Sequence, residues 1–406
     1  MAKELSIKLR TFSALSHKNY RLFFFGQALS LIGTWMQSVA LFWLTLELTR
    51  SPFLLGVLSA VQFAPMTFLS VVGGVAADRF PKKRILIITQ SFMMALAGFL
   101  TVLTSLHLIS YWHLLLIAFG LGIANSFDMP TRQAFVIDLV GPEDLTNAIA
   151  LNSSIFNLAR LLGPALAGVV LAKYGSATCF FINTLSFTAV LAGLFLMDNL
   201  KARKKSSPTS LKEDLTEGFR YLKSHQKLLK TILVVAVLSI FAMNFSVLIP
   251  ILARIDLKLP AEMFGFMMSS FGLGALMGAL SMATFSKKLN LNKVINTSAF
   301  LMAFLQLAMP LAKKPILAMV LLFLTGFFTI AFNSGSNSYL QKNVNDTYRG
   351  RVMSIYTTVF AGFAPLGSLF AGTVSHYLNA AGTFAVGAIL ALILILMINF
   401  TLGRKP

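Results

Sequence analysis

The residues of this sequence that are best placed for chemistry are charged side chains that interrupt long apolar runs. Arg160 lies about 10 residues inside such a run, near the middle of a bilayer at ~1.5 Å of rise per residue. A base at that depth costs about 2.5–3.5 kcal/mol even on the lenient insertion scale, so it must face a cavity or a partner. We expect Arg160 to contact an anionic or polar group of a bound solute, or to form a structural ion pair within its helical bundle.

A second pair of charges closes another apolar run, at Asp128-Met129-Pro130-Thr131-Arg132. Asp128 and Arg132 are four residues apart, so they share one helix face and can pair across the distortion at Pro130. Besides Asp128, the acid that lies within a span is Glu47, at the outer end of the first run. A carrier driven by protons needs an acid that can change its protonation state. Asp128 and Glu47 are therefore candidates for coupling, while a gate or a structural pair stays open for Asp128.

Uncharged polar residues also occur in the apolar runs and could line a passage or hold helices together, among them Gln37, Asn125, Asn244 and Asn333. The sequence has no phosphate-binding glycine loop, no paired catalytic carboxylates and no nucleophile elbow. Its five histidines form no ligand pair, and the single cysteine allows neither an internal disulfide nor a thiol–metal cluster. We therefore expect no catalytic residue, no bound metal and no cofactor, and we do not expect an enzyme.

The elements that would position these residues are membrane-spanning helices. With 56% hydrophobic residues and a mean hydropathy of +0.77, the chain is too apolar for an ordinary soluble domain. A helical span needs about 20 mostly apolar residues. Twelve such spans are predicted, near 21–47, 52–77, 84–106, 111–135, 145–172, 176–198, 230–252, 262–285, 292–311, 315–338, 350–377 and 381–402.

The net charge of +20 reflects topology and not a surface for nucleic acid. Most of the 34 Lys and Arg fall in segments that lie inside if the N-terminus is inside, which fixes the orientation by the positive-inside rule. Both termini are then cytoplasmic. Residues 1–21 are basic and polar without a cleavage site, so no removable signal peptide is expected.

A basic hydrophilic segment divides the spans six and six, which predicts a first bundle at residues 1–200, a linker at 201–229 and a second bundle at 230–406. The halves repeat each other, because Gly120 and Gly326 are separated by nearly the same distance as Gly168 and Gly372. Within the linker, residues 210–221 have the pattern of an amphipathic helix lying on the membrane surface, and a solvated linker is the alternative.

The inside loop after the second span carries a cluster predicted to act as a conformational latch, formed by Gly74, Asp78, Arg79, Lys82 and Lys83. Gly74 would let another backbone approach closely. Asp78, one helical turn on, could then meet the N-terminal dipole of a neighbouring helix.

The cluster at 74–84 resembles the loop motif G-x-x-x-D-R-x-G-R-R of the major facilitator superfamily, with Pro81 in place of the second glycine. The resemblance implies an all-α membrane protein of two pseudo-symmetric six-helix bundles around a midplane site. It also implies that helices 1, 4, 7 and 10 line the cavity, which favours the positions of Gln37, Asn125, Asn244 and Asn333. Helix 2 would meet helix 11, and helix 5 would meet helix 8, along stripes of small residues.

The fifth span resembles the superfamily's antiporter motif, G-x-x-x-G-P-x-x-G-G, at Gly163, Pro164 and Gly168. In the superfamily this motif marks exporters. Asp128-x-Pro-x-Arg132 is similar to the enterobactin-exporter branch. Leu116 stands where proton antiporters usually carry an arginine, so the resemblance supports export more strongly than proton antiport.

Together these features predict a secondary exporter in a bacterial cytoplasmic membrane. It would move a small amphipathic solute, a siderophore or a drug, by alternating access and proton antiport, as a monomer in contact with membrane lipid and not with nucleic acid. Two alternatives stay open. One is a lysophospholipid flippase, and the other is a transporter-shaped sensor or scaffold that moves nothing.

Overall fold

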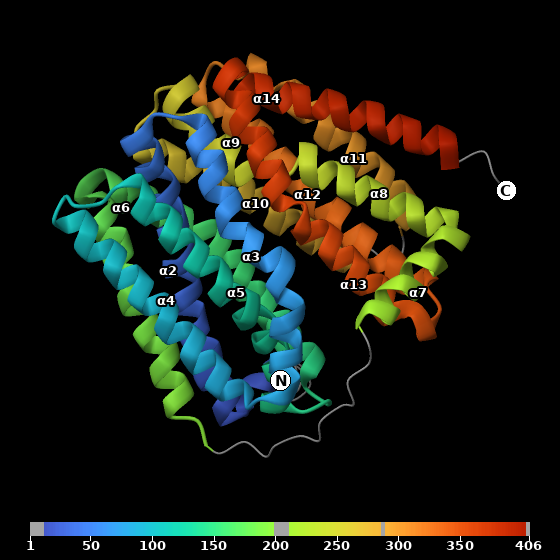
Figure 1. Cartoon of the computed structure of the whole chain (residues 1–406), viewed down its shortest axis with the longest axis horizontal. Coiled ribbons are helices and arrows are strands. Elements are labelled where there is room, and N and C mark those ends of the chain that lie inside the picture. The colour runs from blue at the N-terminus through green and yellow to red at the C-terminus, as the bar shows by residue number, and fades with distance from the viewer. Residues whose placement is uncertain (1–11, 199–210, 286–288, 403–406) are drawn as a thin grey trace, which may run out of the picture. The chain divides into compact units, whose positions relative to one another are not determined.

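The computed structural model describes residues 12–198, 211–285 and 289–402, and every regular element within these ranges is a helix (Figure 1). The predicted latch and site residues all fall within them, whereas the basic start of the predicted linker, 201–210, lies outside the described residues. The α-helices are α2 (Lys18–Thr49), α3 (Pro52–Arg79), α4 (Lys82–Ser105), α5 (Tyr111–Val140), α6 (Leu145–Phe195), α7 (Leu211–Ser224), α8 (Gln226–Phe241), α9 (Phe245–Ile251), α10 (Ala261–Phe285), α11 (Leu291–Leu307), α12 (Pro315–Asn343), α13 (Asp346–Gly362) and α14 (Ala364–Leu402). Three short turns complete the set: η1 (Ser13–Ser16), the π-helical η2 (Leu252–Asp256) and η3 (Met309–Leu311).

Ten helical stretches in the described residues are long and apolar enough to cross a membrane. Two of them, Leu145–Phe195 and Asp346–Leu402, have 51 and 57 residues, more than twice the roughly 20 that one crossing needs. Each contains one residue with a left-handed φ, Gly175 at 78° and Asn379 at 68°. Each stretch is therefore two successive crossings, and the described residues make the twelve that the sequence predicts.

The two breaks use different residues for the same bend. Glycine has no Cβ to clash at positive φ, whereas asparagine tolerates this region because its side chain can bond locally. Here the Asn379 Oδ1 atom accepts a hydrogen bond of 2.8 Å from the Gly382 N–H. The side chain thus caps the helix that follows the bend.

The described chain divides into two compact units. Unit 1 contains the residues up to Leu44 and those from Phe68 to the end of α6, and unit 2 contains Thr45–Thr67 and the residues from α7 onward. The tip of α2 and the first half of α3 therefore belong to unit 2. The predicted domain boundaries, 1–200, 201–229 and 230–406, stay a prediction.

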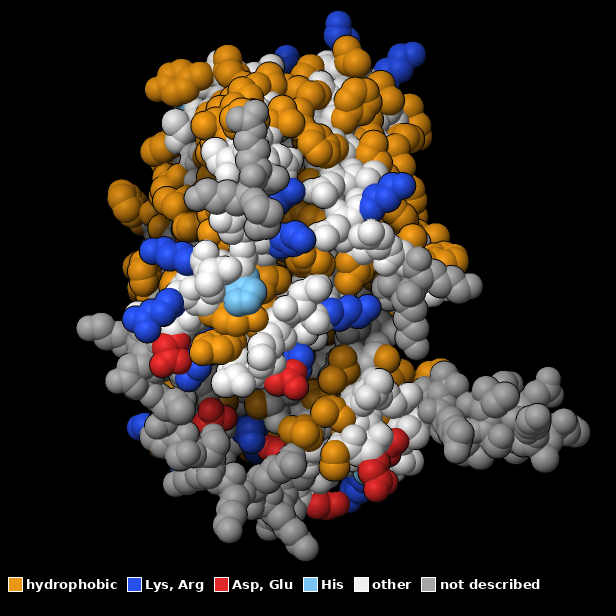
Figure 2. Space-filling model, turned by 90° about the vertical axis from the view of Figure 1, so that its right-hand side faces the viewer, with side chains coloured by type: hydrophobic (Ala, Val, Ile, Leu, Met, Phe, Trp, Pro, Cys, Tyr) orange, Lys and Arg blue, Asp and Glu red, His pale blue; other side chains and the backbone are white. Residues whose placement is uncertain are grey.

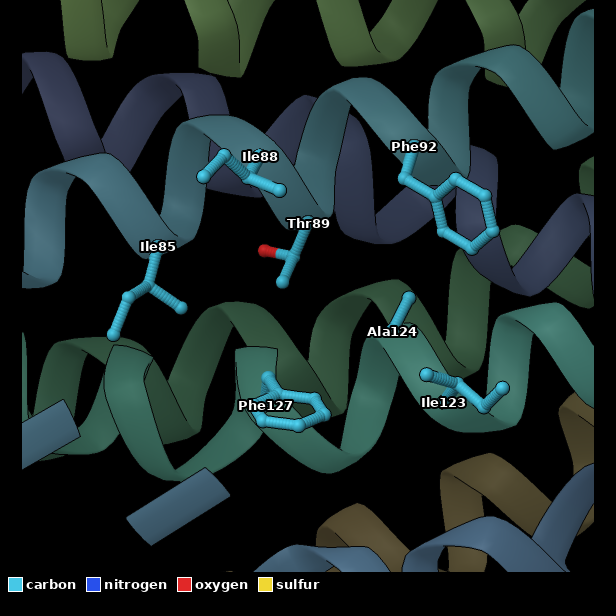
Figure 3. A pocket seen from close by; sticks show the side chains of 7 residues that line it. All are labelled: Ile85, Ile88, Thr89, Phe92, Ile123, Ala124 and Phe127. Atoms are coloured by element: carbon cyan, nitrogen blue, oxygen red, sulfur yellow. The ribbon is translucent and has the colours of Figure 1, made fainter. Parts of the chain in front are cut away.

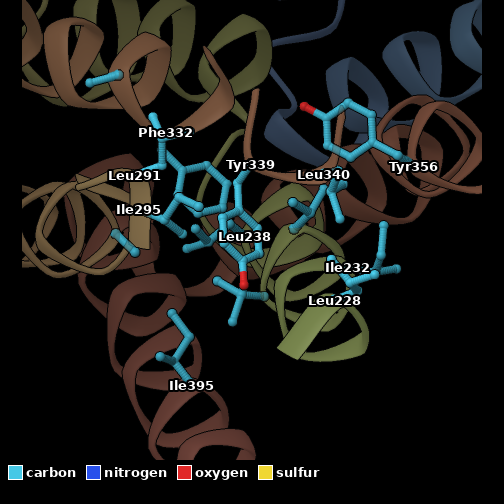
Figure 4. Packing of buried hydrophobic residues seen from close by; sticks show 14 of the residues in the cluster. Leu228, Ile232, Leu238, Leu291, Ile295, Phe332, Tyr339, Leu340, Tyr356 and Ile395 are labelled. Carbon is cyan, nitrogen blue, oxygen red and sulfur yellow. The ribbon is translucent and has the colours of Figure 1, made fainter. Parts of the chain in front are cut away.

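Each unit has its own apolar core. In unit 1 the largest fully buried side chains include Tyr20, Phe23, Phe135, Phe180 and Phe187. In unit 2 a cluster from α8, α11, α12, α13 and α14 buries the residues labelled in Figure 4, which are Leu228, Ile232, Leu238, Leu291, Ile295, Phe332, Tyr339, Leu340, Tyr356 and Ile395.

Many large apolar side chains point away from both cores, as Figure 2 shows for one face. Phe68 is 76% exposed, Trp112 72% and Tyr377 78%. Soluble proteins rarely expose large contiguous apolar patches, whereas lipid-facing helices must. The chain is a multi-pass membrane protein.

Candidate functional site

The centre of the candidate site is Asp128 on α5, whose side chain is fully buried in unit 1. Its Oδ1 atom accepts hydrogen bonds from two consecutive residues of α4, from Thr89 Oγ1 at 2.9 Å and from Gln90 Nε2 at 2.7 Å. Its Oδ2 atom forms an ion pair with Arg132, one helical turn further along α5. The four-residue spacing therefore predicts a pair that is present in the structure.

Arg132 extends this cluster to a third helix, because its Nη1 atom donates to Gln27 Oε1 on α2. We call Gln27, Thr89, Gln90, Asp128 and Arg132 the buried polar cluster. Taking two charges out of water costs several kcal/mol per ion, which only good geometry and additional hydrogen bonds offset. The donors around Asp128 provide those bonds, so the cluster joins α2, α4 and α5 within unit 1.

The buried polar cluster is not fully satisfied. The Nε2 atom of Gln27, the Oε1 atom of Gln90 and the Nε atom of Arg132 are buried without a hydrogen-bond partner in the described part of the chain. Such atoms carry a desolvation cost of about 1–3 kcal/mol each. The cluster therefore leaves two donors and one acceptor that a buried water could satisfy.

An apolar groove lies directly beside Thr89, between α4 and α5 (Figure 3). Its volume is about 320 Å³, and it is lined by Ile85, Ile88, Thr89, Phe92, Ile123, Ala124 and Phe127. Thr89 belongs both to this groove and to the buried polar cluster, because its side chain lines the groove and its hydroxyl donates to Asp128.

Arg160 and the helix-5 motif lie in the first half of α6. Arg160 is half-buried, and Gly163, Pro164 and Gly168 are buried. A Cβ atom at Gly163 would lie 2.5 Å from the Trp35 Cβ atom, so this glycine allows α6 to approach α2 within unit 1. The α-helix continues through Pro164, and its break comes at Gly175. The solute-binding role of Arg160 stays a prediction.

Two of the predicted latch residues, Lys82 and Lys83, make polar contacts inside unit 1. Lys82 pairs with Asp138 of α5 at 2.7 Å, and Lys83 donates to the Met197 carbonyl at 3.1 Å. Both lysines therefore fasten the start of α4 within unit 1. Asp78 and Arg79 are exposed.

Gly73, the neighbour of the predicted latch residue Gly74, is the glycine that allows α3 to approach α5 closely. Within unit 1 nothing lies within 4 Å of a Cβ atom placed on Gly74, whereas a Cβ atom on Gly73 would lie 2.1 Å from the Ser126 carbonyl oxygen. The α3–α5 contact thus depends on Gly73, because it is this residue that faces α5. A latch role for Gly74 and Asp78 in alternating access stays a prediction.

The hydrogen bonds of the other predicted polar residues do not connect them to the buried polar cluster. Gln37 accepts a hydrogen bond of 2.8 Å from Asn183 of α6, which makes it a link between helices. Asn125 donates to the Leu121 carbonyl one turn earlier in α5, and Asn244, which lies between α8 and α9, donates to the Ile240 carbonyl of α8. Asn333 keeps a buried Oδ1 atom without a partner among the described residues.

Glu47 lies in unit 2, where it forms an ion pair of 3.7 Å with Arg254 of η2. Its carboxylate is half-exposed, unlike that of Asp128. Glu47 and Asp128 therefore occupy different units and different environments.

Sequence reasoning missed the α4 members of the buried polar cluster. Thr89 and Gln90 are adjacent polar residues in an otherwise apolar run, and this was the only signal they gave. Asp138 and Asp144 were also missed, because a single acid near a span end has no recognisable pattern. Asp144 binds the N-terminal turn, accepting from Ser13 Oγ at 2.5 Å and pairing with His17 Nε2 at 2.8 Å.

Twelve crossings in two units, with a charged cluster in one of them, define a polytopic membrane protein. The family model described as transmembrane secretion effector matches residues 9–405. The chain belongs to this family of the major facilitator superfamily.

Among relatives, the chain is 28% identical to the staphyloferrin A transporter of Staphylococcus aureus, over 95% of this chain and 96% of the relative. It is 23% identical to macrolide efflux protein A of Streptococcus pyogenes, over 91% of this chain and 95% of the relative. The solved structure of the nucleoside transporter NupG superposes with a TM-score of 0.75 at 12% identity, covering 96% of this chain and 99% of that one. This likeness confirms the predicted fold.

Proposed function

We propose that the protein exports a small amphipathic solute of the siderophore or drug type by alternating access, driven by proton antiport. The observation that carries this proposal is the full-length likeness to two proteins, one named as a siderophore transporter and one as a macrolide efflux protein. The protein would act as a monomer in a bacterial cytoplasmic membrane, with both termini in the cytoplasm as the positive-inside rule indicates.

Alternating access is supported by the way the α2–α3 hairpin, Thr45–Thr67, is fastened inside unit 2. A Cβ atom on Gly56 would lie 2.7 Å from the Cα atom of Gly372, so α3 and α14 touch backbone to backbone. The Ser59 and Ser368 hydroxyls are 2.9 Å apart, in hydrogen-bond contact.

The ion pair between Glu47 and Arg254 is part of the same hairpin attachment. Contacts made by small residues and single hydrogen bonds can separate and re-form at modest cost. In this proposal the hairpin releases from unit 2 when the protein opens to the other side of the membrane.

For coupling we propose Asp128, because it is a buried acid that holds a partly buried base. Protonation of its carboxylate would remove the charge that binds Arg132, and the guanidinium would then be free to take an anionic group of the solute. Arg160 is proposed to bind a second anionic or polar group of the same solute.

The proposal is tested with purified protein in liposomes whose lumen is acidic, with staphyloferrin A and a radiolabelled macrolide as two separate probes. Inside-out molecules should accumulate one of these probes in the lumen, and a protonophore should abolish the accumulation. The variant Asp128→Asn should bind the probe but lose the dependence on the pH gradient.

Two other results would refute the proposal. Translocation of a labelled lysophospholipid with no movement of either probe would identify a flippase. A correctly folded protein that moves no probe and no lipid would indicate a sensor or scaffold.

A further inference from the structure

Helix α7 has two faces of different character, and its apolar one is occupied by protein. Leu222 is fully buried in the core cluster of unit 2. Gly218 is also buried, and a Cβ atom there would lie 2.8 Å from the Ile355 Cδ1 atom of α13. The side of α7 formed by Gly218 and Leu222 therefore packs within unit 2 and is not available to lie in the membrane.

Aromatic and charged contacts fix α7 in this position. The Tyr221 ring stacks on His225 at 4.0 Å and on Tyr348 of α13 at 4.5 Å between ring centroids. Glu217 forms an ion pair of 2.7 Å with Arg351, whose guanidinium also lies 5.6 Å from the Tyr348 ring centroid. Glu217 is therefore paired within unit 2; the other two acids of α7, Glu213 and Asp214, lie in its first turn, whereas Arg220 and Lys223 lie in its second half.

The opposite face of α7 is exposed and combines one aromatic ring with two bases. Phe219 is 50% exposed, and Arg220 and Lys223 are exposed as well. Lys223 follows Arg220 by three residues and Phe219 by four, so it is a neighbour of both on the helix surface. Figure 2 views the molecule from the side on which α7 lies in Figure 1 and shows Lys and Arg side chains set among hydrophobic ones, with Asp and Glu side chains in the lower half of the view.

The position of α7 along the chain places this face at the edge of the membrane. Only His225 separates α7 from α8, where the apolar stretch Gln226–Asp256 begins. Lys227, in the first turn of α8, is exposed too. The face therefore lies where the hydrocarbon core ends and the headgroups begin.

We propose that the face formed by Phe219, Arg220 and Lys223 binds anionic phospholipid headgroups, with the Phe219 ring inserted among the upper acyl chains. Bases near a negatively charged leaflet each raise the affinity about fivefold, and an aromatic ring favours the same depth. Since the apolar face is held on α13, the lipid binds to a surface that is already ordered. The proposal does not depend on which solute is exported.

The first test measures lipid retention by the full-length protein. The double variant Arg220→Gln/Lys223→Gln is compared with Lys313→Gln/Lys314→Gln, which removes two exposed bases between α11 and α12. Native mass spectrometry after exposure to equal amounts of phosphatidylglycerol and phosphatidylcholine gives the ratio of the tightest-bound lipids. We expect the ratio of bound phosphatidylglycerol to bound phosphatidylcholine to fall by a factor of about five or more in the α7 variant and to stay at the wild-type value in the control. An unchanged ratio in the α7 variant overturns the proposal.

The second test locates the face directly. Phe219→Cys in a Cys179→Ala background is labelled with a water-soluble maleimide in detergent and in nanodiscs of phosphatidylglycerol or phosphatidylcholine. We expect labelling to slow about tenfold in phosphatidylglycerol and less in phosphatidylcholine. Equal rates in all three would mean that the face is solvated, and equally slow rates would mean that a protein segment covers it. Either result refutes lipid binding, and transport activity is not needed for the readout.

Discussion

At the scale of single residues, Asp128 and Arg132 depend on each other. The variant Arg132→Leu leaves a fully buried carboxylate facing only Thr89 and Gln90, and we expect it to cost about 3–5 kcal/mol of stability. The double variant Asp128→Leu/Arg132→Leu removes both charges, so most of that loss should be recovered. The apparent melting temperature in detergent, followed by intrinsic fluorescence, measures both. A double variant that melts as early as the single one would contradict this account.

The N-terminal turn should respond to acid through Asp144. The Ser13 hydroxyl and then His17 hold the pKa of this carboxyl below its usual value. The pKa of Asp144 is lower when the N-terminal turn is docked than when the chain is unfolded. Ionised Asp144 therefore stabilises the docked turn fully above the unfolded pKa of about 3.9, and this stabilisation is lost as the pH falls through the folded pKa. Hydrogen exchange of the peptide around Ala14, corrected for intrinsic rates, should therefore show protection that falls below about pH 4.

Asp144→Asn supplies the control for this acid response. The variant should show weaker protection of the same peptide at neutral pH and no further loss between about pH 5 and about pH 3, the range in which carboxyl groups titrate. A variant that keeps the wild-type acid response would show that another group is responsible.

The sequence predicts only part of the buried polar cluster, for a physical reason. Asp128 and Arg132 are neighbours on one helix, so periodicity alone brings them together. Thr89 and Gln90 reach Asp128 from α4, and Gln27 reaches Arg132 from α2, across packing that no local pattern encodes.

At the scale of helices, adjacent glycines of α3 have unequal roles. Gly73→Leu would place a side chain against the Ser126 carbonyl of α5 and force the two helices apart, whereas Gly74→Leu meets no atom of unit 1 within 4 Å of its Cβ. We expect the first change to lower the apparent melting temperature clearly, with a cost of about 1–3 kcal/mol or more, and the second to be nearly neutral. Comparable melting of the two variants would refute this assignment.

The number and limits of the helices were largely predictable, because a lipid-crossing helix must satisfy its backbone internally and be apolar for about 20 residues. Asn379 was not, since an asparagine at positive φ has no warning pattern in the sequence. The contact of Gly73 with α5 was not predictable for a similar reason: apolar runs do not reveal which side of a helix meets its neighbour.

At the scale of the whole molecule, release of the hairpin from unit 2 should be required for transport. Ser59→Cys/Ser368→Cys, in a Cys179→Ala background, joins α3 to α14 where the hydroxyls are 2.9 Å apart. We expect the oxidised protein to lose transport and to regain it on reduction.

A matched crosslink within unit 2 serves as the control. Ser375 and Thr383 are also 2.9 Å apart, but they join the two crossings of α14 on either side of Asn379, which alternating access need not separate. Ser375→Cys/Thr383→Cys should transport normally when oxidised. Full transport by the crosslinked Ser59–Ser368 protein would refute the role of the hairpin.

The bends at Gly175 and Asn379 have a consequence for the ancestry of the chain. They are separated by the same number of positions as Gly168 and Gly372, so both pairs occupy equivalent places in the two halves. A module with an even number of crossings returns to the side from which it started, so a tandem copy inserts in the same orientation as the original. Duplication of one such module would produce this spacing, with glycine at the bend in one half and asparagine in the other.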